Sequence, residues 1–345
     1  MRNEFEESFG FIDLYRAHKK CRLGKQHKAE VIKYEISLGL NLLKLSAEVL
    51  NGLYKVGHYK EFMVYEPKKR LIEALRYKDR IVQWALCNGV MEPIIEKKLI
   101  LDNAACRKGK GTLFAIKRLQ EFLFNHYSKQ KSDAGYFLKC DIKKYFASIN
   151  HQILIEQLRK CGFDERSLNL MREIIASRNK EEGKGLPLGN QTSQWFALLY
   201  LNGMDHFIKE KLRIKYYIRY MDDFILIHES KEYLKHCKTE IQKYLLKINL
   251  ELNPKTQIGQ LKHGIDFLGF RHILTPSGKV IRVLRQQYKL SLKRKLKKMG
   301  ARKEAKQVDD NFVLVRVNAF KAHVKRSNSK NFLRKQLILR KLVDK

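Results

Sequence analysis

Two adjacent aspartates, Asp222 and Asp223, are the residues of this chain whose surroundings most clearly suggest chemistry. The residues on both sides are aromatic or β-branched, which predicts two short strands with the aspartates at the turn between them. Two neighbouring carboxylates on an apolar hairpin repel each other unless a cation lies between them. A divalent metal ion suits that place, because hard cations take carboxylate oxygens as ligands. The alternative is a solvated turn, in which aspartate is common.

A third carboxylate favours the metal interpretation. Asp141 lies near the end of the apolar segment 136–142, which is typical of a buried strand. If that strand neighbours the hairpin, the three carboxylates meet at one end of one sheet. Such a cluster can hold two Mg²⁺ ions, one to activate an attacking hydroxyl and one to stabilise a leaving pyrophosphate, with the Ile142 carbonyl as a further ligand. The set predicts phosphoryl transfer, which needs little beyond positioning and charge neutralisation.

Helical and strand patterns alternate around these carboxylates, which predicts an α+β layer with helices packed on a sheet. Four polar residues stand where helices are expected to begin and are candidate N-caps, namely Asp79, Thr112, Asn150 and Asp164. Helices are expected over 30–50 and 231–248, from each of the four caps, from Ser193, and in the lysine- and arginine-rich stretch after about 284. Strands are expected at 60–66 and 71–72 on either side of a basic turn 67–70, at 136–142, in both arms of the aspartate hairpin within 214–227, at 267–270 and on both sides of 276–278.

The composition indicates a polyanionic partner. The chain has 345 residues, with 71 lysines and arginines against 36 acidic residues, a formal net charge of +35. A folded protein with this excess repels itself unless it meets a polyanion, and nucleic acid is the usual one. The alternative is a merely basic surface. The length predicts two or three subdomains.

Cysteine usage and hydropathy argue against other classes. The six cysteines stand singly, without a C-x-x-C pair or clustered histidines, so free thiols in a reducing cytoplasm fit better than a zinc site. No apolar run is long enough to span a membrane, and the first residues are not typical of a signal peptide.

Several sequence blocks resemble those of reverse transcriptases, and they follow in that family's order. The segment 220–223 (YMDD) is similar to the family's signature hairpin, and 140–146 (CDIKKYF) is similar to its first aspartate block. The resemblance extends over about residues 55–275, and its upstream blocks match retron- and group II intron-like members. The other similar blocks are 79–83, 105–112, 185–194, 252–256 and 267–270.

This resemblance implies an α+β right-hand polymerase fold with fingers, a palm and a short helical thumb. We expect an N-terminal extension and fingers in 1–135 and a palm with an antiparallel sheet in 136–275. Residues of about 150–187 are expected to contribute to the fingers, and 276–345 to form a basic thumb. The thumb helices are expected to follow the phosphates of a template–primer duplex.

The resemblance also implies roles for residues beside the aspartates. Phe146 resembles the aromatic gate that excludes a ribose 2′-hydroxyl, and Lys255 resembles the lysine that protonates the leaving pyrophosphate. Arg70, with Lys68 or Lys69 beside it, resembles the cation that grips the incoming triphosphate. The alternatives are a core phenylalanine and solvated cations. Arg80 is expected to join the same nucleotide-binding cluster.

One block departs from the wider family. Leu188 stands where most reverse transcriptases have glutamine, and Gln194 stands where they have proline. This variant resembles the enzymes of diversity-generating retroelements, as does the block 62–68. Replacing an amide by Leu188 removes a hydrogen bond to the bound nucleotide, so fidelity should fall. The resemblance implies adenine-mutagenic copying with the help of a small basic accessory protein; the alternative is drift within a related prokaryotic clade.

Together these features predict an RNA-directed DNA polymerase that uses two Mg²⁺ ions. Its expected partners are template RNA, an RNA–DNA duplex and deoxynucleoside triphosphates. Its expected location is the cytoplasm, as a prokaryotic or phage-encoded enzyme. One alternative is an enzyme of the same fold in antiphage defence or a retron-like element. Another is a non-catalytic RNA-binding scaffold, against which the intact set of three aspartates argues, because a scaffold has no need of converging carboxylates.

Overall fold

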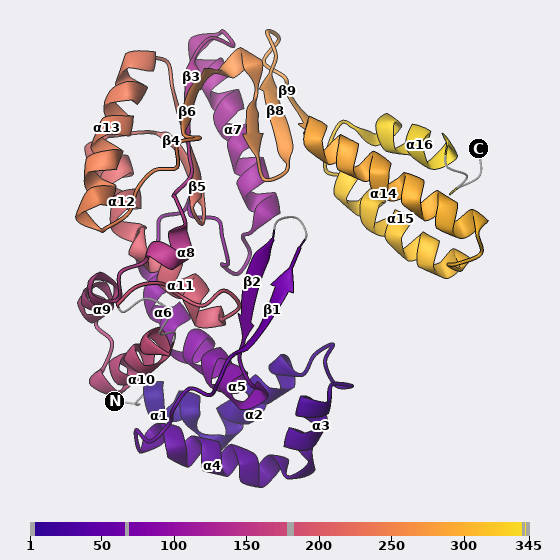
Figure 1. Ribbon diagram of the computed structural model, residues 1–345. Coiled ribbons are helices and arrows are strands. Elements are labelled where there is room, and N and C mark those ends of the chain that lie inside the picture. Colours follow the sequence, from indigo (N-terminus) through magenta and orange to yellow (C-terminus); the bar gives the residue numbers. More distant parts are fainter. Residues whose placement is uncertain (1–3, 66–68, 178–182, 340–341, 343–345) are drawn as a thin grey trace.

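Residues 4–65, 69–177, 183–339 and 342 are described in the computed structural model. They form an elongated molecule with helices at the N-terminal end, a central sheet with covering helices, and a C-terminal helical bundle beside the sheet (Figure 1). None of the described helices is long and apolar enough to cross a membrane. Lys68, expected in the basic turn, lies outside the described residues.

The N-terminal helices pack around an apolar core that begins with Phe5 and Phe9. The predicted helix 30–50 is divided at Ser37, whose backbone leaves the helical region (φ −124°, ψ 44°). The predicted hairpin is present as an antiparallel pair of strands. The elements of this part are α1 (Glu4–Phe9), α2 (Phe11–Cys21), α3 (Ala29–Ile36), α4 (Leu38–Leu50), β1 (Lys60–Val64), β2 (Arg70–Ala74), α5 (Tyr77–Ala85), η1 (Leu86–Met91), α6 (Glu92–Ile95), η2 (Glu96–Lys98) and α7 (Thr112–Gln130).

A four-stranded antiparallel sheet with the strand order β4-β5-β3-β6 forms the centre of the molecule. Helices join β3 to β4 and β5 to β6, as the alternating patterns predict, whereas a tight turn joins β4 to β5. The elements of this part are β3 (Tyr136–Cys140), α8 (Tyr145–Ser148), α9 (His151–Lys160), α10 (Glu165–Ala176), α11 (Gln191–Tyr200), α12 (Asn202–His206), η3 (Phe207–Lys211), β4 (Tyr216–Tyr220), β5 (Asp223–His228), α13 (Lys231–Lys247), β6 (Gln257–Gln260) and η4 (Leu261–His263).

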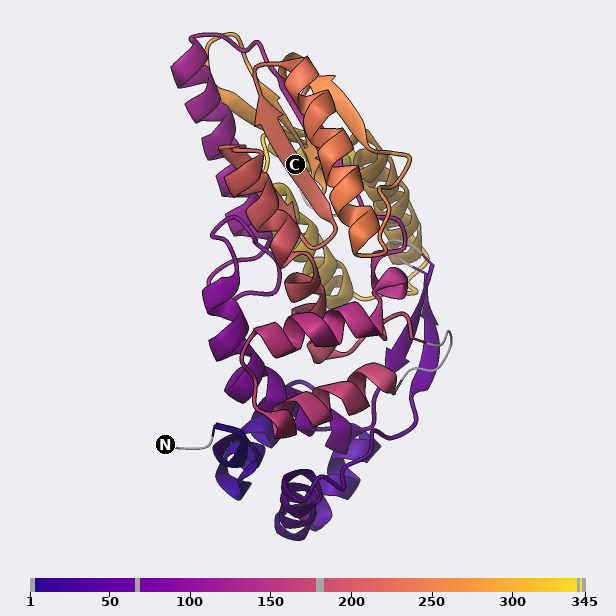
Figure 2. The ribbon, with the colours of Figure 1, turned by 90° about the vertical axis from the view of Figure 1, so that its left-hand side faces the viewer.

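The central strands are apolar on both faces, because successive side chains of a strand point to opposite sides. On β5, Phe224 and Leu226 join the core that contains α13, whereas Ile225 and Ile227 join a second core that contains α7. Figure 1 shows α13 and α7 on opposite sides of the sheet, and Figure 2 looks onto α13. The sheet is therefore clamped between two helices, which explains why its strands lack a polar face.

Two of the four predicted helix caps are confirmed. The side chains of Asn150 and Asp164 accept hydrogen bonds from backbone amides three residues on, at the starts of α9 and α10. Thr112 is wrong as a cap, because Gly111 precedes α7 with a φ of +105°. Asp79 is also wrong. It lies inside α5, fully buried, where its carboxylate accepts a hydrogen bond from the Tyr54 hydroxyl at 2.7 Å.

The C-terminal part consists of a second antiparallel sheet followed by three helices with their own apolar core. Strands on both sides of 276–278 are confirmed, so the expected palm–thumb boundary at 275 falls inside a hairpin of this sheet. The division of the chain into fingers, palm and thumb stays a prediction. The elements are β7 (Ile265–Phe267), β8 (Phe270–Leu274), β9 (Val280–Leu284), α14 (Gln286–Glu304), α15 (Asp310–Val324) and α16 (Lys330–Leu339).

Candidate active site

The aspartate hairpin is a tight connection between β4 and β5. Tyr220 pairs with Asp223, so only Met221 and Asp222 form the turn. Met221 adopts a φ of +57°, a left-handed conformation that is uncommon for a residue other than glycine. Such backbone strain persists only where the surrounding structure holds it, and it concentrates at functional sites.

The sheet register brings Asp141 to this turn. Cys140, the last residue of β3, pairs with Phe224, so Asp141 follows directly beside the start of β5. Asn253 holds Asp141 from the other side: its Nδ2 donates to Asp141 Oδ2 at 2.9 Å, and its backbone amide donates to the Asp141 carbonyl at 2.7 Å. The second of these bonds belongs to a bridge between Ile142 and Leu252. Asn253 belongs to the block 252–256 that resembles reverse transcriptases, but the resemblance assigned no role to this residue.

Asp223 is the least satisfied carboxylate of the three. Its Oδ1 is buried and has no hydrogen-bond partner among the described residues, while its Oδ2 lies 3.6 Å from Lys139 Nζ. Burial is the main reason that the pKa of Asp223 is raised to about 6; Lys139 opposes this shift, and the charges of Asp141 and Asp222 add to it. Burial also raises the pKa of Asp222, and Asp141 adds to the effect. The tip of the hairpin thus concentrates negative charge in a half-buried place.

These side chains fit a hard divalent cation, which would neutralise the crowded carboxylates and give Asp223 Oδ1 a partner. Among the described residues, no three carboxylate, imidazole or thiol groups lie close enough together to hold a metal ion. Two of the carboxylates instead face protein donors, Asp141 facing Asn253 and Asp223 facing Lys139. Mg²⁺ commonly takes only one or two carboxylates and completes its shell with water and substrate phosphates, so an open arrangement suits it.

A buried ion pair supports the hairpin, and neither of its members was predicted from the sequence. Arg219 of β4 and Asp205 of α12 both have fully buried side chains, and Arg219 Nη2 lies 2.5 Å from Asp205 Oδ2. The Tyr217 hydroxyl donates to the same carboxylate at 2.6 Å. Arg219 Nη1 also donates to the Met221 carbonyl at 3.0 Å. The ion pair therefore reaches the strained turn itself.

The predicted triphosphate cations separate into two places. Lys69 and Arg70 are exposed at the start of β2, and the positive charge of Arg70 opposes the rise in the pKa of Asp222. Arg80 instead pairs with Glu30 at 3.0 Å and donates to the Leu75 carbonyl. The charge of Arg70 therefore influences the Asp222 carboxylate, whereas Arg80 forms an ion pair with Glu30 of the N-terminal helices.

The segment that contains Leu188 connects the hairpin β1–β2 to the aspartate end of the sheet. The Leu188 carbonyl accepts a hydrogen bond from the Glu73 amide at 3.0 Å, and the Leu186 amide donates to the Phe146 carbonyl at 2.8 Å. Directly after Leu188, Gly189 approaches β2 so closely that a Cβ would lie 2.7 Å from the Glu73 carbonyl oxygen. Leu188 and Phe146 are both half-buried.

The last two predicted site residues are exposed. Gln194 lies on the surface of α11, and Lys255 follows the Asn253 segment. The backbone amide of Lys255 donates to Asn253 Oδ1 at 3.1 Å, so the residue that holds Asp141 also positions the backbone of Lys255.

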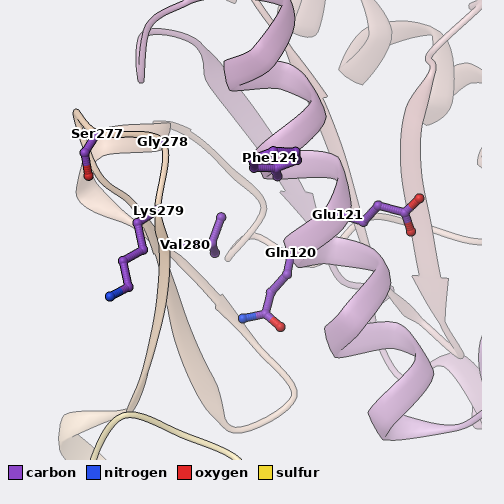
Figure 3. Close-up of a pocket in the computed structure, with 7 residues that line it drawn as sticks. All are labelled: Gln120, Glu121, Phe124, Ser277, Gly278, Lys279 and Val280. Carbon is purple, nitrogen blue, oxygen red and sulfur yellow. The ribbon is translucent and has the colours of Figure 1, made fainter.

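Among the surface depressions that lie outside the aspartate cluster, two border the elements described above. The larger, with a volume of about 1220 Å³, separates the N-terminal helices from the hairpin β1–β2 and α5, and Arg80 and Asn190 line it. A smaller groove of about 480 Å³ lies between α7 and the turn joining β8 to β9, where Phe124 and Gln120 face Val280 (Figure 3). None of the predicted site residues lines the smaller groove.

The central antiparallel sheet, its carboxylates at one end, the hairpin whose Arg70 acts on them and the separate helical bundle define a right-hand nucleic-acid polymerase. The sequence model of the family described as reverse transcriptase (RNA-dependent DNA polymerase) matches residues 60–272. The chain belongs to this family and is an RNA-directed DNA polymerase, so the fold and the enzyme class predicted from the sequence are confirmed.

Individual relatives are distant. Protein YkfC of Escherichia coli (strain K12) is 26% identical over 286 residues, which cover 67% of this chain and 72% of that protein. The COX1/OXI3 intron 1 protein of Saccharomyces cerevisiae is 22% identical over 188 residues, 51% of this chain and 22% of that protein.

Two solved telomerase structures share the fold. One is telomerase from Candida albicans in complex with a fragment of telomeric RNA, with a TM-score of 0.52, 12% identity, and coverage of 72% of this chain and 49% of that one. The other is apo telomerase from Candida tropicalis, truncated from its C-terminal domain, with a TM-score of 0.51, 16% identity, and coverage of 66% and 55%. The present chain thus spans about half the length of these telomerase chains.

Proposed function

We propose that this enzyme copies a template RNA into DNA by two-metal phosphoryl transfer centred on Asp141, Asp222 and Asp223. The observation that carries the proposal is the state of Asp223, whose buried Oδ1 has no partner and whose pKa is raised to about 6. A carboxylate in that state destabilises the fold unless a cation binds it. Its position at the start of β5, beside the end of β3, supports a metal-ion role over a structural one.

Two Mg²⁺ ions held by the three aspartates and the Ile142 carbonyl would activate the attacking hydroxyl and neutralise the leaving pyrophosphate. The residues of the chain do the binding and positioning. Lys69 and Arg70 would hold the triphosphate of the incoming deoxynucleotide through charge-assisted hydrogen bonds. The half-buried ring of Phe146 would exclude a 2′-hydroxyl, and Lys255 would give a proton to the pyrophosphate.

The large cleft beside the hairpin β1–β2 supports single-stranded RNA as the template. Proteins bind single strands with a positively charged groove and with aromatic rings on which bases stack. The net charge of +35 supports the same partner. Arg80 would belong to this cleft and not to the triphosphate site. The basic and aromatic residues that line the cleft are Lys20, Lys25, Lys28, Lys60, Arg76, Arg80, Tyr59, Phe62 and Trp84.

The primer-extension activity can be tested with a matched pair of variants. Asp222→Asn should abolish Mg²⁺-dependent DNA synthesis on a primed RNA template, whereas Asp13→Asn, which changes an exposed aspartate of α2, should leave it unchanged. Synthesis at the wild-type rate by Asp222→Asn would rule out the metal-ion role. Phe146→Ala should raise the incorporation of ribonucleotides, and an unchanged preference would remove its role as a gate.

We further propose that the enzyme is the error-prone polymerase of a diversity-generating retroelement, working with a small basic accessory protein. Leu188 supports this, because it is half-buried in the segment that joins β2 to Phe146 and offers the nucleotide no side-chain hydrogen bond. Sequencing DNA made on a defined RNA should reveal errors concentrated at template adenines. An even spread over the four bases would favour the second candidate, a reverse transcriptase of antiphage defence or of a retron-like element.

A Leu188→Gln variant makes the fidelity test sharper. If the missing side-chain amide causes the errors, glutamine should lower the error frequency at adenines more than at the other bases. An isosteric control, Leu188→Met, should keep the wild-type error spectrum, because methionine has a volume similar to that of leucine and carries no amide. An unchanged spectrum in Leu188→Gln would place the origin of the errors elsewhere.

A further inference from the structure

We propose that Arg219 is a positioning residue for polymerisation: its guanidinium fixes the turn that presents Asp222, and Asp205 fixes the guanidinium. The inference rests on the proposed role of Asp222. It adds to the metal site a buried charge pair that touches neither nucleotide nor metal ion and acts through the backbone of Met221.

The contacts of the Arg219 side chain converge on this turn. Its Nε and Nη2 donate to the two oxygens of Asp205 at 2.7 and 2.5 Å, which fixes the plane of the guanidinium. Nη2 also donates to the Leu198 carbonyl at 3.1 Å, and Nη1 donates to the Met221 carbonyl at 3.0 Å. Lysine could not make this set of contacts, because only the planar fork of arginine offers donors in several fixed directions.

The backbone of Arg219 is held as firmly as its side chain. A segment from the N-terminal half of the chain runs parallel to β4 at Asn103. The Arg219 amide donates to the Asp102 carbonyl at 3.0 Å, and the Ala104 amide donates to the Arg219 carbonyl at 2.9 Å. The Asp102 carboxylate is in turn held by Arg118 at 2.6 Å and Lys209 at 3.1 Å. Arg219 therefore has little conformational freedom, and the Met221 carbonyl that it holds is restricted as well.

The Met221 carbonyl needs such a donor because of its conformation. A residue other than glycine at a φ of +57° is strained, and it returns to a common conformation unless its neighbours prevent this. A buried ion pair is often replaceable by apolar residues without loss of stability. Arg219 of this pair also holds the strained Met221 carbonyl next to Asp222. We therefore infer that the pair serves the geometry of the aspartate turn more than the stability of the fold.

The test is a paired replacement, Asp205→Leu with Arg219→Met, which removes both charges and keeps the volume. We expect a folded protein with a modestly lowered melting temperature, because the buried Tyr217 hydroxyl loses its acceptor, and with unchanged affinity for RNA. The kcat of primer extension should fall roughly ten- to hundredfold, with little change in KM for the deoxynucleotide, because the carboxylate is misplaced. Binding of Mn²⁺ to the protein alone, followed by electron paramagnetic resonance, should weaken in parallel. Wild-type kcat and Mn²⁺ affinity in the paired variant would overturn the proposal.

A second variant, at Arg219 alone, keeps the positive charge and removes the planar guanidinium. Arg219→Lys should fold, because Asp205 retains a counter-charge, yet it should show the same losses in kcat and Mn²⁺ affinity. Full activity in Arg219→Lys would also overturn the proposal. Asp222→Asn, assayed beside them, separates the two hypotheses. If it is inactive while Arg219→Lys and the paired variant behave as wild type, only the positioning role fails; if it is active, the proposed metal site itself fails.

Discussion

The tip of the aspartate hairpin and the layer that supports it hold buried carboxylates in opposite ways. In the supporting layer, Asp205 accepts hydrogen bonds from Arg219 and Tyr217, so its charge is fully compensated. At the tip, Asp223 keeps a buried oxygen without a partner, and its pKa is raised to about 6. A charge that the fold neutralises is part of the scaffold, whereas one that it leaves uncompensated marks where a ligand is needed. Four measurements can break or sharpen this contrast.

The largest effect is expected at the tip. Asp223→Asn should lower the rate of primer extension about a thousandfold, because a metal ligand supplies several kcal/mol of transition-state stabilisation. The same variant should raise the free energy of unfolding at pH 7 by about 1 kcal/mol, a figure reduced for partial solvent access, because the buried charge is removed. Enzyme assays and urea unfolding measure the two effects. A loss of stability would mean that Asp223 is compensated after all.

The supporting layer should respond in the opposite direction. Asp205→Asn should lower the free energy of unfolding by about 3 kcal/mol, because it leaves the Arg219 guanidinium buried without a counter-charge. Urea unfolding followed by circular dichroism measures this change. The exposed Asp13→Asn is the control, since its ion pair with Arg16 lies on the surface. Equal stability of the two variants would remove the distinction between tip and scaffold.

Asn253 lies between the two extremes, because it holds a tip carboxylate from the protein side. Asn253→Ala should slow primer extension at least about tenfold, as is typical when the partner that orients a metal ligand is lost. The change in stability should be small, since the side chain is only half-buried. Asn169→Ala, at an exposed position of α10, is the matched control. Wild-type rates in Asn253→Ala would show that Asp141 needs no such support.

The smallest effect is a pH dependence of stability. The pKa of Asp223 is higher in the folded protein, about 6, than the ordinary value of 3.8. The folded state therefore binds the proton more tightly, and this contribution to stability is complete at low pH and is lost as the pH rises through 6. Wild type minus Asp223→Asn should show a loss of about 1 kcal/mol between about pH 4 and pH 7. A flat difference would contradict the burial of this charge.

The sequence could predict the tip because its signals are local. Asp222 and Asp223 stand between two apolar strands, and Asp141 ends a third, so alternation and composition were enough to place them. The hairpin β1–β2 and the caps at Asn150 and Asp164 have equally local causes, and all are present. The sequence blocks that resemble reverse transcriptases added Phe146 and Leu188 to the predicted site, and the roles of these two residues stay predictions.

The supporting layer could not be predicted, because its partners are distant in sequence and its residue types are ordinary in a chain this basic. Nothing adjacent to Asp205 indicates that it meets Arg219, and nothing near Asn253 indicates that it faces Asp141. The same cause explains the error at Asp79, which looks like a helix cap but is held by Tyr54 from an earlier segment. Arg80 is likewise close to Arg70 in sequence, yet its partner Glu30 comes from a distant helix.

The parallel contact between Asn103 and Arg219 also limits how the chain can vary. The loop 105–111 is closed by a hydrogen bond from the Gly111 amide to the Ala104 carbonyl at 2.8 Å. Just beyond it, the Thr112 hydroxyl lies 3.4 Å from that of Tyr220, so the loop is fastened to β4 at both ends. Surface loops usually tolerate insertions and deletions. This one should not, because a single added residue would displace β4, the strand that leads into the aspartate turn.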